Sequence, residues 1–171
     1  MNLLLEKQIK TLKQINSEIK KAGYRITPII IGKFALTVYT QGMYPSNMIQ
    51  LLFPDIPLFE KILKNLGFEK MGDFFVKGDI VVEISKNFEL IPEGIFNQIE
   101  ADGELINVIS LEDLLIDMMK QCIEGDETVC DLIKMLIKSY YSTLDFHSIF
   151  RKTKDKRSVK KFKEFQKSLY N

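Results

Sequence analysis

The sequence contains few of the residues on which common metal and nucleophile sites depend. It has one histidine, two cysteines and no tryptophan among 171 residues. The single histidine, His147, excludes sites built from several imidazoles and mechanisms that need two of them. The Gly-x-Ser-x-Gly, Walker and His-Glu-x-x-His motifs are also missing. Their absence excludes the serine hydrolases, P-loop proteins and zincins that these motifs define.

The two cysteines and the short apolar stretches argue against a zinc site and a membrane-spanning segment. Cys122 and Cys130 flank a Gly-Asp-Glu loop with no second cysteine pair, so they do not match a zinc site, and we expect reduced, half-buried helix residues. Apolar stretches such as 28–31 are far shorter than the roughly 20 residues that cross a bilayer. A charge directly follows three leucines at the start, without a cleavage site. We therefore expect no secretory signal, no membrane partner and a cytoplasmic protein.

The near-neutral total charge conceals two oppositely charged parts. Residues 1–150 hold 15 basic and 21 acidic side chains, whereas residues 151–171 hold 9 basic and 2 acidic ones. The net charges are therefore −6 and +7. Since 46% of all residues are hydrophobic, the chain has enough apolar surface for a folded core. The composition indicates an acidic folded body with a basic tail.

Strand and helix patterns are mixed in the first two thirds of the chain. Apolar residues at helical spacing from Leu5 to Ile19 predict an amphipathic helix that stops at Gly23. Asp102-Gly103 between two β-rich runs predicts a hairpin. The other expected elements are strands at 29–31 and 47–53, helices at 33–41 and 57–66, and strand pairs at 74–76 with 80–84 and 95–101 with 104–109.

Helical patterns alone follow from Ser110 onward. Ser110 and the acidic residues after it resemble a capping box. We expect helices at 111–124, 128–140, 146–152 and 155–169. The sequence therefore predicts an α+β fold with a helical C-terminal portion. We expect one domain over 1–150, helical from about 110, and a basic tail over 151–171.

The order of these pieces resembles the nucleotidyltransferase-like superfamily. The resemblance covers roughly residues 5–150. Over this range the chain is similar to small bacterial minimal nucleotidyltransferases and abortive-infection antitoxin-like domains. It implies a mixed sheet flanked by helices. The segments that carry it are Ile31-Gly32-Lys33, Tyr44-Pro45-Ser46, Leu66-Gly67-Phe68-Glu69, Val81-Val82-Glu83-Ile84 and the run from Val108 to Leu114.

The resemblance implies a nucleotide site beside the first strand. In the family this strand ends in Gly-Gly or Gly-Ser, whose backbone N–H groups approach phosphate. Here Gly32 is kept and Lys33 takes the second position. The alternative is that Gly32 only ends the strand and Lys33 is solvated. The nucleotide-binding candidates are Gly32, Lys33, Ser46, Asn47, Gln50 and Lys120.

The resemblance also implies a metal site of three carboxylates, two of which are missing. The family's Asp-x-Asp falls on Met48 and Gln50, and Glu83 matches the third position. A thioether and a neutral amide are poor ligands for Mg²⁺. We therefore expect a degenerate site, with no cofactor unless the protein is active with Mg²⁺ bound at Glu83. Alternatively, Glu83 faces solvent or pairs with Lys77.

The acids that open the first C-terminal helix have two interpretations. Glu112, Asp113 and Asp117 are explained by helix capping, although the resemblance places this helix beside the nucleotide cleft. Lys120 on the same helix is either an anion ligand or solvated. His147 follows a helix start, where a structural role is favoured over that of a general base.

The basic tail is the third candidate site. Basic residues interleaved with Phe162, Phe165 and Tyr170 are compatible with nucleic-acid binding. The favoured alternative is an amphipathic helix that docks its phenylalanines and leaves its lysines in water. The nucleic-acid candidates are Lys156, Arg157, Lys160, Lys161 and Lys163.

Three functions follow from these features. The favoured hypothesis is a catalytically degenerate, nucleotidyltransferase-like pseudoenzyme that acts as a binding or regulatory module, in the manner of an antitoxin, on a protein partner or a nucleotide. The second is an active, metal-dependent transferase that moves a nucleoside monophosphate from a nucleoside triphosphate. The third is a nucleic-acid-binding protein that uses its tail.

Overall fold

A computed structural model describes residues 3–169 and shows two compact units. The first comprises Met1–Glu89 and Glu93–Ile109, and the second comprises Leu90–Pro92 and Ser110–Asn171. These two units are defined by the contacts within each of them. The expected boundary at residue 150 was drawn from the charge of the sequence, and it stays a prediction. Within the described residues no helix is long and apolar enough to cross a membrane.

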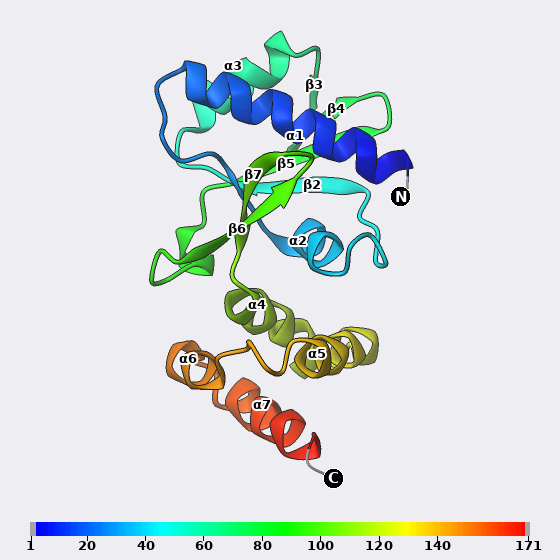
Figure 1. The fold of residues 1–171 in the computed structure, drawn as a ribbon, viewed down its shortest axis with the longest axis vertical. Helices are drawn as coiled ribbons and strands as arrows, with labels where there is room; N and C mark the ends of the chain where they lie inside the picture. Colours follow the sequence, from blue (N-terminus) through cyan, green and yellow to red (C-terminus); the bar gives the residue numbers. More distant parts are fainter. Residues whose placement is uncertain (1–2, 170–171) are drawn as a thin grey trace. The chain divides into compact units, whose positions relative to one another are not determined.

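The first unit is built on a mixed sheet of seven strands in the order β3-β4-β5-β2-β1-β7-β6 (Figure 1). β1 pairs antiparallel with β2 and parallel with β7, and β2 pairs parallel with β5. The strands are β1 (Ile29–Ile30), β2 (Met48–Leu52), β3 (Glu69–Met71), β4 (Phe74–Lys77), β5 (Ile80–Ser85), β6 (Phe96–Ala101) and β7 (Glu104–Ile109).

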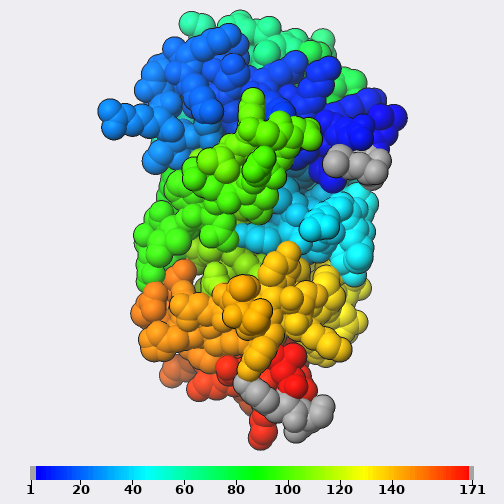
Figure 2. All heavy atoms as spheres, in the orientation of Figure 1, coloured from blue at the N-terminus to red at the C-terminus, as the bar shows by residue number. Residues whose placement is uncertain are grey.

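Three helices cover the faces of this sheet. Figure 1 shows α1 (Leu3–Lys21) and α3 (Ile56–Asn65) on one side of β2, and α2 (Gly32–Tyr39) on the other. The buried face of α1 carries Leu12, Ile15 and Ile19, each no more than 1% exposed. In Figure 2 the β6–β7 hairpin lies against α1, where Lys13 Nζ donates to the carbonyl of Asp102 over 2.8 Å. The apolar stripe of α1 thus closes one face of the core.

The second unit consists of four helices. They are α4 (Leu111–Ile123), α5 (Glu127–Ser139), α6 (Phe146–Lys152) and α7 (Lys156–Ser168). Ser110 caps α4 by accepting the N–H of Asp113, and Asp145 caps α6 in the same way through Ser148. Phe162 and Phe165 of α7 are 0% and 5% exposed. Within the basic tail, Lys156–Ser168 therefore form an amphipathic helix whose phenylalanines are part of the core of this unit, whereas Tyr170 lies outside the described residues.

The structure confirms the predicted α+β fold and its mixed sheet with helices. It differs from the sequence-based expectation in two places. β3 was not predicted, because its three residues are all exposed and show no alternation. Cys122 and Cys130 were expected to be reduced and half-buried, but their sulfur atoms form a disulfide that joins α4 to α5, and the two residues are only 4% and 3% exposed. That expectation is wrong because the tight turn between the helices brings the two Cα atoms to 4.8 Å.

Candidate functional site

The residues at the predicted metal positions are brought together by two parallel strands. In the β2–β5 register, Gln50 pairs with Glu83 and Met48 pairs with Val81. Alternate residues of a strand point to opposite faces. Ile49 and Leu51 therefore enter the core at 0% exposure, while Met48, Gln50 and Glu83 share the opposite face, which carries α2 in Figure 1.

Gly32 lies in close contact with the side chain of Gln50. Its φ of +62° falls in the left-handed region that favours glycine. A Cβ added at this position would stand 2.6 Å from Gln50 Oε1, so a larger residue requires both a strained backbone and a displaced glutamine. Two separate constraints therefore hold glycine at this position.

Gln50 also accepts a hydrogen bond from the backbone N–H of the residue after Gly32. The N–H of Lys33 donates to Gln50 Oε1 over 2.7 Å. The N–H groups of the first helical turn have no partner within their own helix and are the usual donors to a bound anion. Here one of these donors is satisfied by a side chain of the neighbouring strand. The side chain of Lys33 is exposed.

The amide of Gln50 reaches Glu83 with its other end. Gln50 Nε2 donates to Glu83 Oε1 over 3.4 Å, and Glu83 is half-buried. The order of contacts is thus the Lys33 N–H, the Gln50 amide and the Glu83 carboxylate. Lys77, the other partner considered for Glu83, donates to the carbonyl of Leu66 over 2.7 Å. The amide flip is assigned from these contacts, since the reverse flip would lose both.

The remaining candidate on the loop before β2 is bound within the loop itself. Ser46 is 2% exposed. Its hydroxyl donates to the carbonyl of Met48 over 2.8 Å and accepts the N–H of the same residue over 3.2 Å. The Ser46 carbonyl accepts Gln8 Nε2 over 2.8 Å. These bonds order the start of β2, and they leave the neighbouring Asn47 exposed.

These side chains do not fit the Mg²⁺ site that the resemblance implies. The three matching positions supply one carboxylate, one amide and one thioether, and Mg²⁺ prefers anionic oxygen ligands. Across residues 3–169 no three or more His, Cys, Asp or Glu side chains group together as a metal site would require. Within the described residues Glu83 therefore belongs to no cluster of three or more such side chains.

The acids at the start of α4 serve the helical unit. Asp113 Oδ1 accepts Lys152 Nζ over 3.1 Å, and the two side chains are 2% and 4% exposed. The second oxygen of Asp113 is buried without a hydrogen-bond partner. Burial raises the pKa of Asp113, while the bond from Lys152 opposes that rise. Sequence reasoning missed this pair because nothing in the pattern links two residues 39 positions apart.

The other candidates on these helices have ordinary surface partners. Lys120 is exposed and lies 3.5 Å from Asp117 of the preceding turn. Glu112 Oε2 accepts the N–H of Asp145 over 2.9 Å, which ties the start of α6 to α4. His147 is exposed on α6. This contact is with the backbone before α6, so the capping interpretation of Glu112 at the start of α4 stays a prediction.

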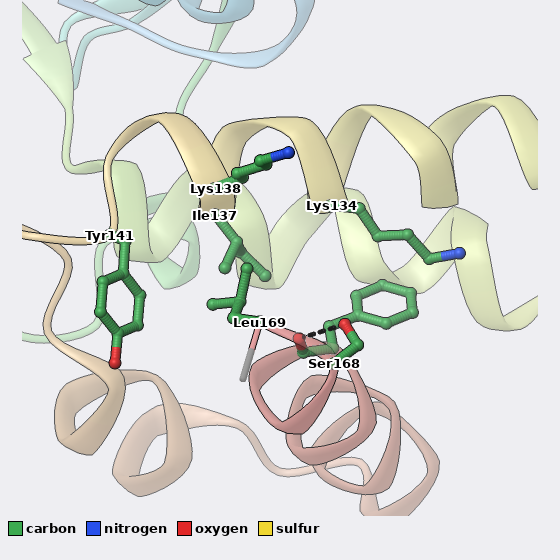
Figure 3. Close-up of a pocket in the computed structure, with 7 residues that line it drawn as sticks. Lys134, Ile137, Lys138, Tyr141, Ser168 and Leu169 are labelled. Atoms are coloured by element: carbon green, nitrogen blue, oxygen red, sulfur yellow. Dashed lines mark hydrogen bonds between the residues drawn. The ribbon is translucent and has the colours of Figure 1, made fainter. Parts of the chain in front are cut away.

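A groove lies within the helical unit, between α5 and α7 (Figure 3). It has a volume of about 420 Å³. Its floor is apolar, and Ile137 and Phe165 are 0% and 5% exposed. Lys134 stands 5.1 Å from the centre of the Phe165 ring, and Figure 3 shows Tyr141 at the opposite end. Among the described residues that line the groove there is no carboxylate.

Comparison with known proteins gives a match at the level of the fold. No protein-family model and no curated protein matches the sequence. The crystal structure of ANT(2″)-Ia in complex with adenylyl-2″-tobramycin has a TM-score of 0.63, with 15% identity over 96% of this chain and 99% of that one. The solution structure of the antibiotic-resistance factor ANT(2″)-Ia has a TM-score of 0.53, with 16% identity over 84% and 97%.

These two structures are of an aminoglycoside nucleotidyltransferase, and the chain has the nucleotidyltransferase fold that they share. The predicted resemblance is confirmed at that level. Coverage of 96% of this chain also extends the likeness beyond the first 150 residues, to which the sequence motifs had confined it.

Proposed function

We propose that this chain is a nucleotidyltransferase-fold binding module without metal-dependent transferase activity. The observation that carries the proposal is the position of Gln50, whose amide accepts from the Lys33 N–H and donates to Glu83. In the family that the chain resembles, the N–H at the position of Lys33 approaches a phosphate and the carboxylate at the position of Glu83 holds a metal ion. Because a neutral side chain already bonds this N–H and this carboxylate, the contacts support a site that binds neither the phosphate nor the metal ion.

The charge at the site supports the same proposal. Transfer of a nucleotidyl group needs cations that offset the phosphate charge, and carboxylates hold those cations. With Met48 and Gln50 at two of the positions, only Glu83 contributes negative charge. The regulatory, antitoxin-like role implied by the resemblance then acts through binding of a protein partner.

The test is a transfer assay with the full-length protein, Mg²⁺ and each nucleoside triphosphate. We expect no pyrophosphate release and no Mg²⁺-dependent rise in melting temperature. Tobramycin serves as one acceptor, because the neighbouring crystal structure contains its adenylylated form. Glu83→Gln is compared with Glu69→Gln, an exposed carboxylate of β3. Turnover that disappears in Glu83→Gln and persists in Glu69→Gln would establish the active-transferase alternative instead.

A further inference from the structure

Four lysines form a row on the exposed side of α7. Lys156, Lys160, Lys163 and Lys167 follow one another at steps of four, three and four residues, the spacing that keeps side chains on one side of a helix. All four are exposed, and together with Val159 and Glu164 they line a shallow depression. We call these four residues the lysine row.

In the described part of the chain the lysine row forms no close ion pair, although Glu164 lines the same depression. Within residues 3–169 none of the four ammonium groups has a carboxylate within 4.0 Å; the one aromatic contact among them is Lys163, 5.9 Å from the centre of the Phe150 ring. Neighbouring basic residues of α7 differ in this respect. Arg157 lies 3.1 Å from Asp155 and 3.7 Å from Glu124, and Lys161 lies 3.9 Å from Glu164.

These contacts change the set of candidate residues. Arg157 and Lys161 were expected to bind nucleic acid, but their charges are already matched by acids of the same unit. The hydrogen bond from Arg157 also holds the pKa of Asp155 below its ordinary value. Lys167, which was not among the candidates, completes the row. The structure thus separates the paired cations of α7 from the unpaired ones.

The buried side of α7 decides the kind of contact. Phe162 and Phe165 are 0% and 5% exposed, so these rings are not available to stack on bases. Val159, half-buried, is the only apolar side chain beside the lysines in the depression. A protein partner is usually anchored by buried aromatic or aliphatic contacts, which this side of the helix does not offer. A ligand of regularly repeated negative charge fits it better.

The length of the row matches a phosphate backbone. Lys156 and Lys167 are 11 residues apart, which corresponds to about 16 Å along the helix axis. A DNA duplex carries one phosphate charge per about 1.7 Å of axis on its two strands together, so several phosphates lie along a row of this length. We propose that the lysine row binds the sugar–phosphate backbone of nucleic acid without reading its sequence. This activity is independent of the proposed function of the sheet.

The test measures binding of the full-length protein to a labelled DNA duplex of random sequence at several salt concentrations. Four neutralised phosphates give a slope of log affinity against log salt of about −3.6. The variant Lys160→Gln/Lys163→Gln is expected to bind more weakly and to reduce the magnitude of the slope by about 1.8. Lys134→Gln/Lys138→Gln on α5 removes the same charge beside the groove of Figure 3 and is the matched control.

Four outcomes of the DNA measurement overturn the proposal, and a competition experiment supplies a fifth. They are no binding at low salt, a slope near zero, an equal loss in the control variant, and a scrambled duplex that binds much more weakly than one chosen sequence. Polyglutamate and vesicles of anionic lipid are used as competitors. If polyglutamate or the vesicles bind as tightly as DNA of equal charge, the surface serves an acidic protein or a membrane and the nucleic-acid assignment is wrong. Circular dichroism establishes that each variant is folded.

Discussion

Single residues at the β2–β5 boundary change what the sheet can do. An acidic residue at position 50 would place its carboxylate beside Glu83, and two like charges at that distance repel unless a cation lies between them. The amide of Gln50 removes this repulsion and uses its two ends as acceptor and donor. The same side chain therefore supplies no second carboxylate beside Glu83 and joins the start of α2 to β5 through its hydrogen bonds.

The buried pair Asp113–Lys152 gives a prediction at the residue scale. Lys152→Met leaves Asp113, whose second oxygen already lacks a partner, as an unpaired buried charge. We expect this variant to lose about 3–5 kcal/mol of unfolding free energy, and Asp113→Ala added to it to restore most of the loss. Urea denaturation of the two single variants and the double variant measures the coupling. Losses that simply add would show that the pair is not coupled.

The pH dependence of the same residue follows from its raised pKa. A carboxyl whose pKa is higher in the folded protein stabilises the fold fully below its unfolded pKa, near 3.8, and this contribution is lost as pH rises through the folded pKa. In Lys152→Met the lowering effect of the ammonium is gone, so the contribution persists to higher pH. We expect the stability difference between this variant and the wild type to shrink on acidification.

At the scale of the elements, the disulfide between α4 and α5 is the least expected link. It closes a loop between residues eight positions apart. Cross-linking such a loop stabilises a fold by about 2–3 kcal/mol in the chain-entropy model. We expect reduction, or Cys122→Ser/Cys130→Ser, to lower the unfolding free energy by about that amount. Thiol titration of the unfolded protein before and after reduction checks that the bond was present, and a reduced protein of unchanged stability would contradict the expectation.

The sequence predicts most of these elements because their signals are local. Gly23, Gly67 and the Asp102-Gly103 turn all have positive φ, as their positions after helices or within a hairpin require. The bridge from Lys33 to Glu83 is different. The types of Gln50 and Glu83 could be read from the sequence, but their hydrogen bonds depend on the register of two strands more than thirty residues apart. The lysine row could not be identified from the sequence, because the sequence does not show which basic residues of α7 form ion pairs with acidic residues.

At the scale of the whole chain, the sheet order brings distant segments together. β2 lies next to β5 and β1 next to β7, while β4–β5 and β6–β7 are local hairpins. The fold therefore combines fast local pairings with pairings that close long loops. The division of charge along the sequence does not coincide with the division into two units, because the acidic and basic parts of the sequence both contribute to the helical unit.

The two-residue strand β1 determines how this sheet comes apart. The β6–β7 hairpin is joined to the other strands of the sheet only through Ile29 and Ile30. A short join of this kind is a natural boundary between cooperative opening units. We expect amide exchange to separate the β6–β7 ladder from the β2–β5 ladder, with the β1 amides exchanging with whichever opens first. Uniform protection across all seven strands would indicate a single unit. If the two ladders exchange separately, a strand of only two residues sets the route of partial unfolding.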